Sequence, residues 1–409
     1  MSSSEAAESG EKPGPSAPLW LLAFFTFTGT LAMHIFVPAL PNAAADLGAS
    51  IAAMQMAVSL YILGLAFGQL VYGPVSDRFG RRPTLVVGLA LYTVAGLAAA
   101  FAPGVHALVA ARLFQALGGC AGLVLGRAIV RDTSGPRDSA RRLALMNLMV
   151  TVGPGVAPLL GTAMATTLGW RSIFFFLFAL GLGGMALAWR LLPETGIHGN
   201  HRSTKELARD YWSLFRSPAF IGYSVGGGCA TTAMYAFVAS APFIFVHQLG
   251  RPEYEAGIYL ALLVSGVWLG SVLTSRLITR IPIERLLVRS NAASVVAAFA
   301  LLATVLTGHL SVFWTVATMF VFTVGVGLAA PAALTQAVSV NPNVIGSASG
   351  LYGFAQMTVG ALCTTLAGLG SNPALSAALV LASAGVVAQL SFWIALRRAP
   401  SPVTEKSGF

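Results

Sequence analysis

Twelve long apolar segments, separated by short polar stretches, dominate the sequence. A helix needs about 20 mostly apolar residues to cross a bilayer, and each segment has roughly that length. The segments do not alternate between polar and apolar residues, which argues against the strands of a membrane β-barrel. The sequence therefore predicts an all-α membrane protein with 12 transmembrane helices. The approximate spans are 19–40, 50–73, 83–102, 105–129, 140–166, 170–192, 219–246, 254–277, 285–307, 310–336, 344–369 and 373–396.

Charge is too scarce in this chain for a water-soluble surface. Only 9% of the residues are charged, whereas a soluble domain has roughly 25%, so lipid must solvate most of the surface. The three cysteines lie inside apolar segments, and their spacing suits neither a metal site nor a disulfide framework. We expect them to be small packing residues, and we expect no metal site and no cofactor.

Basic residues cluster in the connections that follow the second, fourth, sixth and eighth spans. Loops on the cytoplasmic side of a membrane are enriched in Lys and Arg, so both termini are expected to be cytoplasmic. Positive charge then faces the anionic inner leaflet, which accounts for the net charge of +10 without nucleic acid. The cytoplasmic group is Arg78, Arg81, Arg82, Arg131, Arg137, Arg141, Arg142, Arg202, Lys205, Arg209, Arg216, Arg280, Arg285 and Arg289, against Arg171 and Arg251 on the other side.

The longest internal polar stretch, residues 193–218, divides the spans into two groups of six. Leu47 and Gly48 before the second span recur as Leu249 and Gly250 before the eighth. Such symmetry indicates two parallel half-repeats with a binding site at their interface near the midplane. The expected organisation is a disordered cytoplasmic N-tail (1–17), an N-terminal six-helix bundle (18–192), a cytoplasmic linker (193–218), a C-terminal six-helix bundle (219–397) and a cytoplasmic C-tail (398–409).

The connection after the second span reads GPVSDRFGRRP and begins at Gly73. Its glycines permit a tight turn and its arginines hold the loop on the cytoplasmic side. Neither purpose requires Asp77, so we expect a partner for this carboxylate. The stretch resembles the loop signature of the major facilitator superfamily. In that resemblance the conformational-switch positions are Gly73, Asp77, Arg78, Gly80, Arg81 and Arg82.

The family comparison also suggests a place for the carboxylate. We expect Asp77 to lie near the start of the eleventh span, around Asn343 to Ser347, where an Asn-Pro-Asn sequence precedes a helix start. Helix N-termini attract anions. Such a contact would hold the two halves together on the inner side and favour an outward-open state.

Further motifs agree with this resemblance. ARLFQALGGCAG, which begins at Ala111, looks like the family's fourth-helix motif, and VGPGVAPLLG, which begins at Val152, is similar to the fifth-helix motif of its antiporter branch. The positions matched in that second motif are Gly153, Pro154, Pro158 and Gly161. Within the superfamily, FVPALP, GRAIVRD and APLLG together resemble the bicyclomycin/chloramphenicol-resistance (Bcr/CflA) drug exporters.

The resemblance implies a major facilitator fold that works by alternating access. It further implies export of small amphipathic drugs such as antibiotics, in exchange for protons, by a monomer in the bacterial inner membrane. An importer or exporter of a metabolite on the same fold stays open as an alternative. A membrane-embedded enzyme is disfavoured, because the sequence has no His/Asp/Glu constellation near a membrane face, no metal-ligand spacing and no nucleotide-binding loop. We therefore assign no catalytic residue.

Two residues are candidates for proton coupling. Arg112 is the only Lys or Arg well inside a span, and a buried intramembrane charge is by default a functional hypothesis. The alternative is a structural pair with a backbone carbonyl or with Gln115. No acidic residue falls at the midplane, and His34 stands in the first span where many relatives carry an acid. His34 either carries the proton or remains neutral and bonds to substrate or to a carbonyl.

Other aromatic and amide groups lie deep in spans that line the cavity in this superfamily. Aromatic walls with a few polar groups suit a drug-sized pocket, although ordinary helix packing would explain each residue as well. Beside His34, Arg112 and Gln115, the substrate-cavity candidates are Phe36, Asn147, Tyr235, Phe237, Tyr259, Tyr352 and Gln356.

Overall fold

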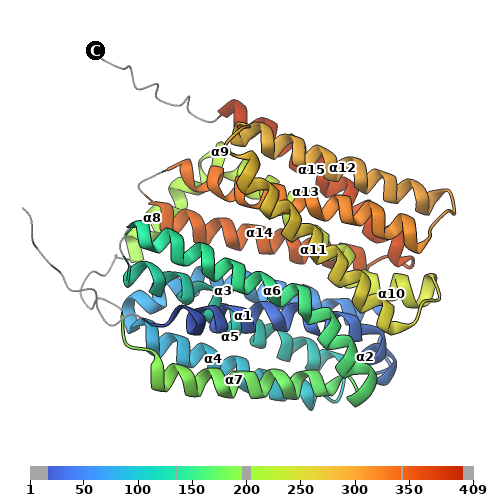
Figure 1. Cartoon of the computed structure of the whole chain (residues 1–409), viewed down its shortest axis with the longest axis horizontal. Helices are drawn as coiled ribbons and strands as arrows, with labels where there is room; N and C mark the ends of the chain where they lie inside the picture. The colour runs from blue at the N-terminus through green and yellow to red at the C-terminus, as the bar shows by residue number, and fades with distance from the viewer. Residues whose placement is uncertain (1–16, 135, 196–203, 342–343, 399–409) are drawn as a thin grey trace, which may run out of the picture.

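The computed structural model describes residues 17–134, 136–195, 204–341 and 344–398, and these residues form a bundle of helices. The helices run side by side along the long axis of the molecule (Figure 1). Eleven of the helical segments in the described part of the chain are long and apolar enough to cross a membrane. The prediction of an all-α membrane protein is therefore confirmed. The predicted tails, apart from Ala17 and Arg398, lie outside the described residues.

The first predicted span is built from three pieces. Helix α1 (Leu19–Ile35) ends where Pro38, which has no N–H to donate, stops the hydrogen-bond ladder. The chain continues through a 3₁₀ turn, η1 (Val37–Ala39), into α2 (Leu40–Asp46). The other spans of the first half are α3 (Ile51–Phe79), α4 (Arg81–Ala100), α5 (Val105–Asp132), α6 (Pro136–Leu168) and α7 (Arg171–Leu191).

The second half repeats this plan. Its first span consists of α9 (Pro218–Thr232), α10 (Met234–Phe243) and a short π-helix, η2 (Ile244–Gln248). The remaining helices are α11 (Glu253–Leu277), α12 (Ile283–Leu306), α13 (Val312–Ser339), α14 (Ile345–Gly368) and α15 (Pro373–Arg398). Helix α14 has the length of a span, but its many Gly, Ser and Thr residues leave it less apolar than the other eleven.

Several helices extend beyond their apolar segments. The stretch that was expected to form a turn after the second span is helical up to Phe79, and Gly80 alone makes the turn into α4 with a φ of +95°. The helix continues because backbone hydrogen bonding does not require apolar side chains, and Pro74 is accommodated within it. A φ in this region favours glycine, which explains the residue type at position 80.

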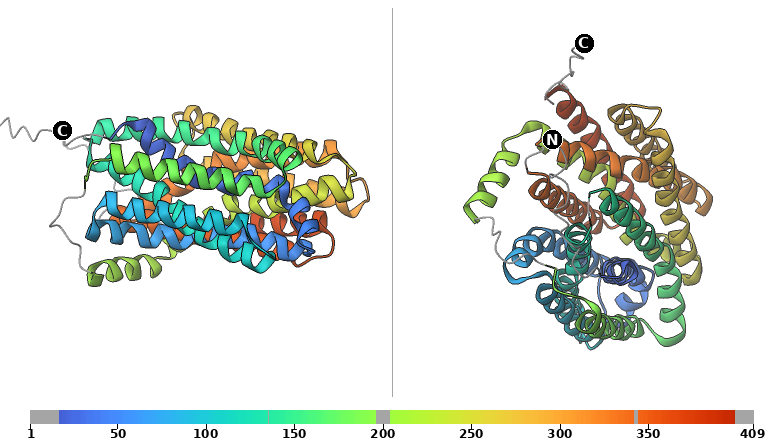
Figure 2. Two further views of the ribbon diagram at one scale, coloured as in Figure 1. Left: turned by 90° about the horizontal axis from the view of Figure 1, so that it is seen from below. Right: turned by 60° about the vertical axis from the view of Figure 1, so that its left-hand side comes forward.

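A helix also forms inside the predicted linker. Helix α8 (Thr204–Phe215) lies on the outside of the bundle, as Figure 2 shows, and packs against α9 and α14. It is amphipathic: Leu214 is buried, whereas Lys205, Glu206 and Arg209 are exposed. The sequence reading recognised only the polar character of this stretch.

The two groups of spans lie next to each other along the length of the bundle (Figure 1). They contact each other chiefly through α3 with α14 and through α6 with α11. We call the end of the bundle that carries α8 and the α3–α4 turn the arginine-rich end. The end that carries Asp46 and Glu253 is the opposite end. The cytoplasmic placement of the arginine-rich end stays a prediction.

Candidate functional site

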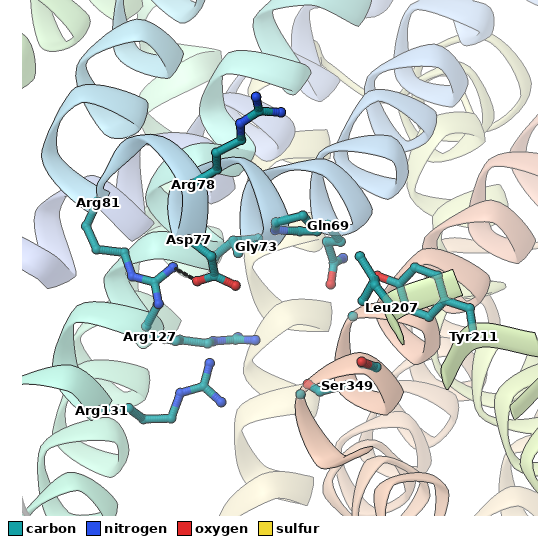
Figure 3. Close-up of a pocket in the computed structure, with 16 residues that line it drawn as sticks. Gln69, Gly73, Asp77, Arg78, Arg81, Arg127, Arg131, Leu207, Tyr211 and Ser349 are labelled. Atoms are coloured by element: carbon teal, nitrogen blue, oxygen red, sulfur yellow. Dashed lines mark ion pairs between the residues drawn. The ribbon is translucent and has the colours of Figure 1, made fainter. Parts of the chain in front are cut away.

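A cavity of about 680 Å³ lies between the two halves at the arginine-rich end. We call it the arginine cavity. Its walls come from α3, the start of α4, α5, α8 and α14, so both halves and the linker contribute (Figure 3). The lining residues are Gln69, Gly73, Pro74, Asp77, Arg78, Arg81, Val124, Arg127, Ala128, Arg131, Leu207, Tyr211, Gly346, Ser347, Ser349 and Gly350.

Asp77 lies in this cavity wall together with Gly346 and Ser347 of α14, close to the region expected from the sequence. Its ion pair, however, is with Arg81, one helical turn onward, at 2.5 Å. Arg81 also donates to Asp132 of α5 at 2.8 Å. Residues 342–343, part of the expected contact region, lie outside the described residues. In this state Asp77 therefore belongs to a charge cluster within the first half.

The Gly80 turn is fixed by a residue from the end of the first half. Glu194 accepts from the backbone N–H of Arg81 at 2.8 Å and of Arg82 at 3.2 Å. Its carboxylate thus occupies the N-terminus of α4, where the helix dipole favours a negative charge. Arg82 in turn donates to the carbonyl of Trp189 on α7. These bonds tie the switch motif to the last helix of the first half.

The two halves are joined at the opposite end. The Asn42 amide donates to the Glu253 carboxylate at 2.9 Å, which links the first span to the start of α11. The Gln55 amide donates to the Ser240 hydroxyl at 3.0 Å, which links α3 to α10. The two halves therefore enclose a large cavity at the arginine-rich end and are linked by hydrogen bonds at the opposite end.

His34 lies deeper in the bundle, in a small apolar pocket. Its Nδ1 is 2.9 Å from the carbonyl oxygen of Thr30, which can only accept, so Nδ1 must carry a proton and Nε2 is the free acceptor in the neutral ring. The pocket has about 20 Å³, enough for roughly one water. We call it the histidine pocket. Its other lining residues are Val37, Pro158, Met234, Val238, Leu260, Leu263, Val264, Val267 and Thr323.

Arg112 is completely buried inside the first half. Its guanidinium donates to the Gln115 side chain at 2.7 Å and to the Ala32 carbonyl at 3.0 Å, and it lies 3.9 Å from the centre of the Tyr61 ring. Ala32 is in the last turn of α1, whose carbonyls have no intrahelical partner. A cation at this point satisfies an orphan carbonyl and complements the helix dipole.

Arg112 therefore bonds to a backbone carbonyl and to Gln115, the two partners expected if its role is structural. It is not among the residues that line either cavity. Its guanidinium is also 5.6 Å from the ring centre of Phe36, which packs on Phe174 within the first half. Gln115 and Phe36 therefore contact Arg112 in this structure, and their role in substrate binding stays a hypothesis.

None of the remaining candidates lines the arginine cavity or the histidine pocket. Tyr235 lies beside His34, with ring centres 6.1 Å apart. Gln356 donates to the Thr231 hydroxyl at 2.7 Å. Of the other four candidates, Tyr259 donates to Glu255, Phe237 is buried, Tyr352 is buried with no hydrogen-bond partner for its hydroxyl among the described residues, and Asn147 lies on an exposed part of α6.

The fifth-helix motif lies in α6, against α1 and α11. Pro158 lines the histidine pocket, and Pro154 lies one turn earlier in the same helix. Gly153 faces the ring of Phe27. A Cβ atom at Gly161 would lie 1.8 Å from the carbonyl oxygen of Ile35, the last residue of α1. The glycine therefore permits the close approach of α6 to the end of α1, next to His34.

This approach predicts a large effect of one methyl group. Gly161→Ala should greatly reduce the yield of folded protein, because overpacking costs about 1–3 kcal/mol even where side chains can move, and here the obstacle is backbone. Gly155→Ala is the matched control in the same helix, since nothing lies within 4 Å of its added Cβ. Size-exclusion profiles and thermal melting of the two variants would compare them. Equal behaviour of both variants would contradict the close packing.

Sequence reasoning did not identify four of the residues that line the arginine cavity. Arg127 and Arg131 are one helical turn apart on α5, and the spacing within GRAIVRD could have placed them on one face. Gln69 on α3 lies against Gly353 of α14. Tyr211 comes from α8, whose amphipathic pattern is the signal that could have revealed it.

Comparisons with known proteins agree on the family. The family model described as Major Facilitator Superfamily matches residues 20–364. An uncharacterized MFS-type transporter, YdgK, of Bacillus subtilis is 29% identical over 378 residues, which cover 91% of this chain and 94% of the relative. A bicyclomycin resistance protein homolog of Haemophilus influenzae is 26% identical over 338 residues, or 82% of this chain and 84% of the relative.

Solved structures share the fold. The crystal structure of a D-xylose-proton symporter superposes with a TM-score of 0.74 at 14% identity, and the match covers 93% of this chain and 97% of that chain. At this identity the likeness concerns the fold alone. The predicted major facilitator fold and the resemblance noted in the sequence are confirmed.

Proposed function

This chain belongs to the major facilitator superfamily, and we propose that it exports small amphipathic compounds such as antibiotics from the bacterial cytoplasm in exchange for protons. The observation that carries the proposal is the arginine cavity, whose 680 Å³ fall within the roughly 300–1,000 Å³ of drug-sized sites. Similarity to a bicyclomycin resistance protein homolog supports drugs as the cargo.

The proposal gives each end of the bundle a role. The protein works as a monomer in the inner membrane, with the arginine-rich end in the cytoplasm, as the distribution of basic residues favours. A compound enters the arginine cavity from the cytoplasm or the inner leaflet. Opening of the opposite end then requires the Asn42–Glu253 and Gln55–Ser240 hydrogen bonds to break. The packing of α6 against α11 must loosen at the same time.

The test is an accumulation assay in a host that lacks its own drug pumps. Cells that express the protein should accumulate several-fold less of at least one amphipathic compound in a panel than cells with an empty vector. Collapse of the proton gradient with a protonophore should remove the difference. Equal accumulation of every compound in both strains would reject drug export, and a difference that survives the protonophore would reject proton coupling.

The Asp77 cluster gives a prediction on switching. Asp77→Asn should impair transport strongly while leaving the amount of folded protein nearly unchanged, because Asp77 is half exposed and a surface ion pair contributes only about 0–1 kcal/mol. The carboxylate is needed when the arginine cavity closes and brings α14 toward α3. Transport per folded molecule is the measurement, and Asp138→Asn, an exposed acid on α6, is the control. Transport at the wild-type rate by Asp77→Asn would contradict a role of Asp77 in the conformational change.

A further inference from the structure

The arginine cavity carries more positive charge than its acidic residues balance. Of its four arginines, Arg81 is engaged by Asp77 and Asp132. Arg78 lies over the ring of its neighbour Phe79 and points away from the cavity in Figure 3. Arg127 and Arg131 have no hydrogen bond or ion pair with any residue that the structure describes, and both guanidinium groups point toward Ser349 across the cavity (Figure 3).

Membrane topology alone does not explain this arrangement. Positive charge is expected at the cytoplasmic end of a span, but it can lie in loops that are open to water. Arg127 and Arg131 instead face the interface between the two halves, four residues apart on one side of α5. Two like charges at this spacing repel each other, so a bound anion would relieve an unfavourable contact.

The other walls suit the same kind of ligand. Val124, Ala128 and Leu207 provide an apolar surface beside the arginines. Across the cavity, α14 contributes the hydroxyl groups of Ser347 and Ser349, of which Ser347 donates to the Asp210 carboxylate of α8 at 3.4 Å. Burial, and then the Asp210 carboxylate, raise the pKa of the Tyr211 phenol, so its hydroxyl stays protonated as a donor.

We propose that Arg127 and Arg131 form an anion site that binds the phosphate or carboxylate group of an amphipathic molecule, with the apolar part against Val124, Ala128 and Leu207. Arginine suits this task because its planar donors match both groups bidentately. An anionic phospholipid headgroup from the inner leaflet and an anionic solute from the cytoplasm share this chemistry. The inference rests on the proposed function only for how the site is used, since binding is measured without transport.

The experiment is calorimetric titration of octyl phosphate into the purified full chain in a neutral detergent. Arg127→Gln and Arg131→Gln should each weaken binding about tenfold or more, because each removes a charged donor that can bond to the anion bidentately. Arg127→Lys should bind with intermediate affinity, because it keeps the charge and loses the bidentate geometry. Arg276→Gln is the matched control, since this exposed arginine ends α11 outside the cavity.

Two competition arms separate the sources of the anion. Displacement of octyl phosphate by dihexanoyl phosphatidylglycerol, but not by the phosphatidylcholine of equal chain length, would assign the site to a lipid headgroup. Displacement by carboxyfluorescein without displacement by the lipid would assign it to an anionic solute. Either result supports the site. Unchanged affinity in Arg127→Gln and Arg131→Gln, or an equal loss in Arg276→Gln, would overturn it, whatever the outcome of the accumulation assay.

Discussion

Arg112→Ala should remove most of the folded protein as well as transport. The substitution leaves the Ala32 carbonyl and the Gln115 side chain without their partner, and each buried orphan costs about 1–3 kcal/mol. It also empties the space between Tyr61, Phe36 and Phe174, and truncation of a large buried side chain typically costs about 2–5 kcal/mol. The sum is a large part of the roughly 5–15 kcal/mol that stabilises a typical domain.

Two further substitutions separate structure from coupling at this position. Arg112→Met keeps much of the side-chain volume and removes the charge, so it should give more folded protein than Arg112→Ala. Arg112→Lys keeps a cation near the end of α1 and should retain part of the transport. Folded yield by size exclusion and transport per folded molecule are the two measurements. Normal, proton-dependent transport by folded Arg112→Ala would show that neither role is correct.

His34→Gln should nearly abolish the proton release that substrate induces in purified protein. His34 is the only side chain lining the histidine pocket that titrates near neutral pH, and its Nε2 is free to take up a proton. A dry apolar pocket favours the neutral ring, whereas a water-filled one favours the cation. Opening toward the acidic outer side would therefore load the proton, and closure would release it inward.

The control for this prediction replaces the ring by an acid. His34→Asp should restore proton release, shifted to lower pH, because a carboxylate ordinarily titrates near pH 4. A pH electrode in weakly buffered detergent solution measures the release. Undiminished release from His34→Gln would exclude His34 as the carrier and point to the carboxylates at the opposite end, Asp46, Glu253 and Glu255.

The spans were predictable because length and hydrophobicity are local properties. The extent of α3 and α5 was not, since polar residues such as Asp77 and Arg131 continue a helix beyond the apolar segment. Helix α8 was missed because its stretch is polar on average, and only the spacing of its apolar residues marks it. Local sequence patterns therefore identified the family and the fold class, but they underestimated the length of the helices.

The interaction partners of individual side chains depend on contacts between distant segments. They could not be predicted from the sequence alone. For Arg112 it offered a carbonyl or Gln115, and the structure has both. For Asp77 it indicated α14, and the structure places the residue in the same cavity but pairs it with Arg81. Arg131 was counted only as a cytoplasmic charge and Arg127 was not singled out, because only the packing of α5 at the interface between the halves places both residues in the cavity wall.

Drug–proton exchange is tested most directly in proteoliposomes that contain only this protein. A compound found in the accumulation assay is added outside vesicles with an acidic interior, so that proton efflux can drive its uptake. The account predicts accumulation above the outside concentration, which collapses when an ionophore removes the pH gradient. Equal uptake with and without the gradient, at a rate above that of protein-free liposomes, would contradict antiport and leave a uniporter.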